Sequence, residues 1–106
     1  MVEISKRDWK LFREKLPGWQ ENYMERLCKE YVELLTSNQK GSARFWALEE
    51  RIKKDRKAPG VILSVSKSDM LIDLVRLVQD GVIDLENLSD FSEDVQERVK
   101  FIVTRW

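Results

Sequence analysis

The chain has 106 residues, of which 42% are hydrophobic and 36% charged, and its 19 Lys and Arg balance its 19 Asp and Glu. This length suits one domain, and the composition is too hydrophobic and too close to neutral for an intrinsically disordered protein. The apolar runs fall far short of the roughly 20 residues that a membrane helix needs, and the N-terminus lacks the apolar stretch of a secretion signal, so we expect a cytoplasmic protein without a membrane span.

The first predicted helix begins at Ser5, whose hydroxyl can cap the free amides of a first turn. Asp8, three residues later, can reach back as the second half of a capping box. Pro17 and Gly18 are predicted to end this helix, because proline removes an amide donor and glycine supplies a flexible joint.

A second helix is predicted from about Trp19 to Leu35, where apolar residues recur at alternating spacings of three and four. Its main stripe is Met24, Leu27, Tyr31 and Leu34, widened by Cys28, Val32 and Leu35. Because Cys28 lies on this stripe and is the only cysteine, it is interpreted as a small core residue, and no internal disulfide can form.

A third helix is predicted from Ser42, its expected cap, to the Pro59-Gly60 pair that closes the segment. A polar loop of residues 36–41 precedes it. Its apolar row is Phe45, Leu48 and Ile52, and Trp46 either flanks that row or is exposed.

The segment from Val61 to Val65 has the composition of a strand but no partner strand, so we expect an extended connector pressed on the core. Ser66 then caps a fourth segment of helix, predicted to be the central and most buried one. Gly81 is placed for a left-handed C-cap, with Val82 packing back on Leu77 as in a Schellman motif.

Residues from Asp84 to Leu88 fit a short helical turn, and Ser92 is the expected cap of a last helix. That helix carries Val95, Val99, Ile102 and Trp106 on one face. The sequence therefore predicts an all-α fold in which residues 1–106 form a single-domain bundle of four main helices, with a short fifth helical turn allowed. The expected centre is Leu74, Val78, Leu27, Tyr31, Leu48 and Val99.

The chemistry available to an enzyme is limited. There is no histidine, which removes the commonest general base and the commonest metal ligand. The four glycines stand apart, so no glycine-rich phosphate loop exists, and the acidic pairs lack the ligand-rich loop of an oxygen-ligand metal site. We expect a protein that is not an enzyme and that has no cofactor, metal site or catalytic residue.

The charges are unevenly divided: residues 1–57 carry a net charge of +4 and residues 58–106 a net charge of −4. The basic side culminates in the run Arg51, Lys53, Lys54, Arg56 and Lys57. Such a division favours a partner that binds through local electrostatic fields. The acidic half could receive the basic run of a second copy, neutralise it within one molecule, or meet a foreign protein with a basic face.

Four tryptophans are many for a helical core of this size, and tryptophan is favoured at interface hot spots. Trp19 and Trp46 are therefore the candidate contact residues. The first hypothesis is a non-enzymatic protein–protein interaction or a small structural or regulatory helical protein, self-associating as a homodimer or binding a partner protein. The alternative is a small nucleic-acid-binding accessory protein that uses the basic third helix, although zero net charge argues against it.

Three segments cover most of the chain: DWKLFREKLPGWQENYMERLCKEYVELL, FWALEERIKKDRKAPGV and VQDGVIDLENLSDFS. They resemble a family of small bacterial helical proteins without a known function, some of which carry the label of multidrug transporter. The resemblance implies a bacterial cytoplasmic protein and transfers no site residue.

Overall fold

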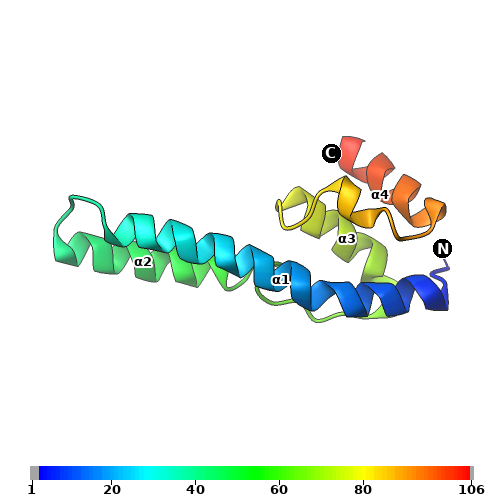
Figure 1. The fold of residues 1–106 in the computed structure, drawn as a ribbon, viewed down its shortest axis with the longest axis horizontal. Helices are drawn as coiled ribbons and strands as arrows, with labels where there is room; N and C mark the ends of the chain where they lie inside the picture. Colours follow the sequence, from blue (N-terminus) through cyan, green and yellow to red (C-terminus); the bar gives the residue numbers. More distant parts are fainter. Residues whose placement is uncertain (1–2, 106) are drawn as a thin grey trace.

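The computed structural model describes residues 3–105, which form four α-helices and two short 3₁₀ turns (Figure 1). None of these residues belongs to a β-strand, so the predicted all-α fold is confirmed. In chain order the elements are α1 (Lys6–Leu35), α2 (Gly41–Asp55), η1 (Lys67–Asp69), α3 (Met70–Gln79), η2 (Leu85–Leu88) and α4 (Glu93–Arg105).

The predicted break at Pro17 and Gly18 is wrong, because α1 runs through both residues as one helix of 30 residues. Proline deprives the carbonyl of Arg13 of its helical donor, but Pro17 and Gly18 are exposed, so water can satisfy that carbonyl. Leu16 and Trp19, on either side of the proline, pack against the same hydrophobic core. Tertiary packing therefore keeps the helix continuous across a sequence that would break it in isolation.

The molecule is an arm attached to a globular part (Figure 1). α2 lies antiparallel along the C-terminal half of α1, whereas α3 and α4 lie against the N-terminal half. The principal extents are 53, 26 and 21 Å, and the radius of gyration is 16.5 Å, compared with about 13 Å for a compact domain of this length. We call the projecting hairpin of residues 24–55 the arm.

The hydrophobic core lies in the globular part, where α1, α3, α4 and the η2 loop meet. Of the predicted central residues, Leu74 and Val99 belong to this core and Val78 packs against it half-buried. The other three, Leu27, Tyr31 and Leu48, lie outside it on the arm, where Leu27 is buried and the others are half-buried. α3 is buried along much of its length, as predicted for the central helix. The largest fully buried apolar side chains are Phe12, Met70, Leu74, Leu77, Leu88, Val95 and Val99.

The predicted end of α3 is confirmed in detail. Gly81 has φ of 73°, and the amides of Gly81 and Val82 donate to the carbonyls of Val78 and Leu77 at 3.1 and 2.9 Å, the two hydrogen bonds of a Schellman motif. The predicted connector is confirmed as well, because Leu63 and the following Val65 pack against the core without forming a strand.

The predicted turn after α3 forms as η2, where the side chains of Asp84 and Asn87 cap each other's backbone amides. Ser92 caps α4 by accepting a hydrogen bond from the amide of Val95. The predicted cap at Ser42 is wrong: α2 already begins at Gly41 and has no side-chain cap. Trp106, predicted on the apolar face of α4, lies outside the described residues.

The cap at Ser66 also differs from its prediction. Its hydroxyl donates to the carboxylate of Asp69 at 3.0 Å and caps no backbone amide. The 3₁₀ turn η1 separates Ser66 from the start of α3 at Met70.

Candidate functional site

The contact line between the two helices of the arm is polar. Arg51 of α2 donates to Glu30 of α1 at 2.9 Å and lies 3.5 Å from Asp55, which accepts a hydrogen bond of 2.6 Å from the hydroxyl of Tyr31. We call these four residues the seam. Asp55 is the only buried residue of α2, so this helix contributes no fully buried apolar side chain to the described part of the molecule.

The seam changes the ionisation of two of its members. Burial, together with the hydrogen bond to Asp55, raises the pKa of Tyr31 to about 12. The hydrogen bond to Glu30 raises the pKa of Arg51, although partial burial opposes this. Both side chains therefore keep their protons at neutral pH, so Arg51 stays a cation between two acidic residues and Tyr31 stays a hydrogen-bond donor to Asp55.

The apolar residues of the arm lie beside the seam, in solvent. Val32 is 59% exposed, Phe45 62%, Ile52 44% and Leu35 40%, and Cys28 is exposed with them. Met24 and Leu48, in the same two rows, are half-buried. We call this set the arm face: Met24, Cys28, Val32, Leu35, Phe45, Leu48 and Ile52.

The two rows of the arm face point to the same side of the hairpin. At about 100° per residue, Cys28 and Val32 are rotated by a quarter-turn or more from the seam residues of α1, in the right-handed sense of the helix. Ile52 is rotated from the seam residues of α2 by a similar angle in the same sense. Because the two helices are antiparallel, equal rotations in the same sense place these side chains on the same side of the hairpin. The arm therefore presents one continuous apolar surface that nothing in residues 3–105 covers.

The prediction that Cys28 is a core residue is wrong, because its side chain is exposed. The stripe on this part of α1 is wider than the surface that one neighbouring helix can cover. α2 covers Leu27, which is buried, and leaves the flank of the stripe open.

The two candidate tryptophans are in different environments. Trp19 is half-buried and packs against the core, with its ring centroid 6.4 Å from that of Phe12 and 6.3 Å from that of Phe91. Trp46 is 62% exposed and meets Phe45 edge-on, with centroids 4.9 Å apart. Only Trp46 therefore lies next to the arm face.

The basic run is mostly free of ion pairs. Arg51 belongs to the seam, whereas Lys53, Lys54, Arg56 and Lys57 are exposed and form no salt bridge with the part of the chain that the structure describes. The acidic half does not neutralise them. The one salt bridge between the two halves of the sequence, within residues 3–105, joins Lys15 to Asp90 at 3.1 Å.

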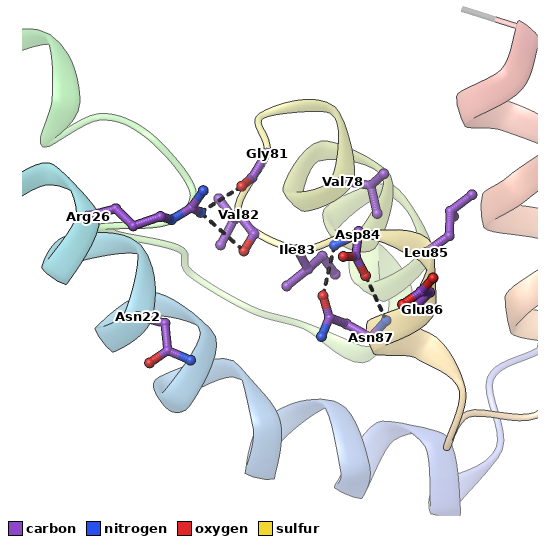
Figure 2. A pocket seen from close by; sticks show the side chains of 10 residues that line it. All are labelled: Asn22, Arg26, Val78, Gly81, Val82, Ile83, Asp84, Leu85, Glu86 and Asn87. Carbon is purple, nitrogen blue, oxygen red and sulfur yellow. Dashed lines mark hydrogen bonds between the residues drawn. The ribbon is translucent and has the colours of Figure 1, made fainter.

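A pocket of about 680 Å³ lies where the loop after α3 meets α1, and Figure 2 shows its lining. Arg26 of α1 points across it and donates to the carbonyl of Gly81 at 2.7 Å. Asp84 and Asn87 engage each other on its far side. Because these polar groups satisfy one another, the pocket fixes the loop against α1 and presents no converging reactive groups.

A second apolar surface lies between α3 and α4, around a groove of about 700 Å³. Ile72 and Phe101 line it and are 55% and 57% exposed. Sequence periodicity did not single out Ile72 or Phe101.

No family model matches the chain, and neither the curated proteins nor the solved structures include a significant match. The resemblance to small bacterial proteins is therefore untested and stays a prediction. Within residues 3–105 no helix combines the length and the apolar content needed to cross a bilayer. No group of three or more His, Cys, Asp or Glu side chains in that range is arranged to hold a metal ion.

Proposed function

We propose that this protein is a non-enzymatic protein–protein interaction module, and that the arm face is its docking surface. The single observation that carries the proposal is the exposure of apolar side chains on both helices of one projecting hairpin. Contiguous apolar surface on the outside of a folded protein is typical of an interaction site.

The position of this surface supports docking. The hydrophobic core of the globular part is complete without the arm, since its cluster is built from α1, α3, α4 and the intervening loops. The arm therefore adds exposed apolar area that the core does not use. Phe45 and Trp46 in particular supply the aromatic anchors that dominate binding energy at interfaces.

Site-specific photo-crosslinking tests the proposal. A photoreactive amino acid at Val32, which is 59% exposed, should give protein adducts in the cells that make this protein. The Phe45→Glu and Ile52→Glu substitutions together should abolish those adducts. The matched control carries the probe at Ile62, which is 65% exposed but belongs to the connector. Equal labelling from both positions, or none from Val32, would remove the proposed function.

The second candidate function is nucleic-acid binding through the basic run. It is favoured by the four exposed cations Lys53, Lys54, Arg56 and Lys57, which are not neutralised within residues 3–105. Phosphate contacts of this kind weaken steeply as salt rises. A fluorescence titration with a labelled oligonucleotide at low salt tests it. Affinity that is undetectable, or unchanged when these four residues become Gln, would exclude it.

A further inference from the structure

We propose that the occupant of the arm face is the arm face of a second copy, with the two-fold axis parallel to the arm, so that two hairpins form a four-helix bundle. This inference rests on the proposed function and adds the identity of the partner. It differs from the pairing of the basic helix with the acidic half expected from sequence, because the contact lies between two arms.

The arm has the pattern of half a bundle. The apolar residues on α1 are spaced by four, four and three positions from Met24 through Val32 to Leu35, and those on α2 by three and four from Phe45 to Ile52. Helix bundles bury rows with this spacing between facing helices. Because the only buried residue of α2 is Asp55, the apolar row of α2 remains to be buried by another chain.

The globular part does not obstruct this contact. Leu16 and Trp19 pack against the core, and at about 100° per residue the arm-face residues of α1 lie about 80–160° round the helix from Leu16 and about 140–180° from Trp19. The core-facing side of α1 therefore points away from the arm face. Two copies can press their arms together while both globular parts point outward.

The charges at the edges of the arm face select the arrangement. Glu30 meets Arg51 across the seam, so Glu25 and Arg56, each five residues nearer the globular part, lie at the same height along the arm. Glu25 is on the outer edge of the α1 row and Arg56 on the outer edge of the α2 row. Both are exposed, and neither forms a salt bridge within residues 3–105.

A two-fold axis parallel to the arm places α1 of one copy over α2 of the other. Glu25 then faces Arg56 of the second copy, and the symmetry repeats the pair on the opposite edge. Pairing α1 with α1 instead would not bring these charges together. Complementary charges at the rim fix orientation and register in this way.

The size of the arm predicts how tight the dimer is. α2 has 15 residues and is about 22 Å long, and two helices are about 20 Å wide, so each copy offers roughly 450 Å² of flat area. A standard interface buries about 800 Å² per partner. We therefore expect a dimer that dissociates in the micromolar range.

Sedimentation equilibrium over about three decades of concentration, centred on the micromolar range, is the first test. The wild type and Ile62→Glu should show the same monomer–dimer equilibrium, and Phe45→Glu with Ile52→Glu should stay monomeric. Circular dichroism confirms that each variant is folded. A wild type that is monomeric throughout, or a dimer that survives both arm substitutions, would overturn the inference.

The natural thiol gives a measurement that needs no variant. Cys28 is exposed in the monomer and belongs to the arm face. Its rate of alkylation by iodoacetamide should fall severalfold as protein concentration rises through the dissociation constant. A rate independent of concentration contradicts burial of this surface.

A charge swap tests the arrangement itself. Glu25→Arg and Arg56→Glu should each weaken the dimer by about fivefold at low salt, because each places like charges at both edges. The double variant should restore wild-type affinity. If it does not, the parallel arrangement is wrong.

A wild type that stays monomeric but crosslinks a foreign protein from Val32 would refute the dimer and leave the proposed function standing.

Discussion

The carboxylate of Asp8, in the first turn of α1, accepts hydrogen bonds from both the hydroxyl of Ser92 at 2.7 Å and its amide at 3.0 Å. Ser92 is the cap of α4, so one buried side chain ties together the starts of two helices that are 84 residues apart in sequence. Burial alone would raise the pKa of Asp8, but the hydrogen bonds from Ser92 and Ser5 and the charge of Arg7 outweigh it and lower the pKa.

Asp8→Asn should therefore lower the free energy of unfolding at pH 7 by about 2 kcal/mol, the range for hydrogen bonds to a charged group. Because the folded-state pKa of Asp8 lies below its ordinary value of 3.8, the stabilisation is present above about pH 4 and is lost as pH falls below it. Urea unfolding at pH 7 and pH 3 measures both effects.

The matched control is Glu14→Gln, a change on the same helix at a carboxylate that is 59% exposed. It should alter stability by only a few tenths of a kcal/mol. A wild type and an Asp8→Asn variant that differ equally at both pH values would contradict the assigned role of the ionised carboxylate.

The environment of Asp73, on α3, disfavours the ionised carboxylate, whereas that of Asp8 favours it. It is buried, its Oδ2 accepts no hydrogen bond from residues 3–105, and Arg76 approaches its other oxygen only to 3.9 Å. Burial and the nearby charge of Asp69 raise the pKa of Asp73. Ionisation of this group therefore costs stability, and the cost appears as pH rises through the folded-state pKa.

Asp73→Asn should unfold at a higher temperature than the wild type at pH 7, with a gain of about 1 kcal/mol. The gain should shrink at pH 4, where the native carboxyl group is increasingly protonated. Thermal unfolding followed by circular dichroism measures the difference, with Glu97→Gln on exposed helix surface as the control. A gain that is larger at pH 4 than at pH 7 would refute the sign.

Tyr31→Phe removes the hydrogen bond to Asp55 in the seam, and we expect a loss of about 1 kcal/mol at neutral pH. The pKa of Tyr31 is raised to about 12, above its ordinary value of 10. The stabilisation is therefore complete below pH 10 and is lost between about pH 10 and pH 12. The difference between wild type and variant in urea unfolding should disappear over that range.

Tyr23→Phe is the comparison for this prediction. The hydroxyl of Tyr23 forms no hydrogen bond within the described residues, so the substitution should change stability little at pH 7. Equal losses from Tyr23→Phe and Tyr31→Phe would show that the seam bond contributes nothing specific.

Local signals in the sequence predicted part of the local structure, although they failed at Pro17, Ser42 and Ser66. The Schellman motif at Gly81 and the cap at Ser92 depend on residues within one turn of each other, and both formed as expected. Asp8 was assigned only to its own helix, because its main partner lies 84 residues away and no local pattern reveals such a bond.

The arm could not be predicted from periodicity, because the spacing of apolar residues does not show which element, if any, buries them. The residues Val32, Phe45 and Ile52 satisfy the same spacing rule as core residues, yet they are exposed. The break predicted at Pro17 is wrong for a related reason. The free-energy cost of a proline inside a helix is a local effect, whereas the packing of Leu16 and Trp19 that offsets it is tertiary. With the break removed, residues that were expected to fold back into a bundle extend away from it.

The continuity of α1 and its contact with Gly60 give a last prediction from two glycines. A Cβ added at Gly18 meets nothing within 4 Å, so Gly18→Ala should stabilise the protein by about 0.5–1 kcal/mol, the helical preference of alanine over glycine. A Cβ added at Gly60 would collide with the ring of Tyr23, so Gly60→Ala should destabilise it by about 1–3 kcal/mol. Urea unfolding of the two variants beside the wild type measures both. If Gly18→Ala destabilises the protein, the chain does not pass through Pro17 as a continuous helix, and if Gly60→Ala is neutral, the chain at Gly60 does not lie against Tyr23 of α1.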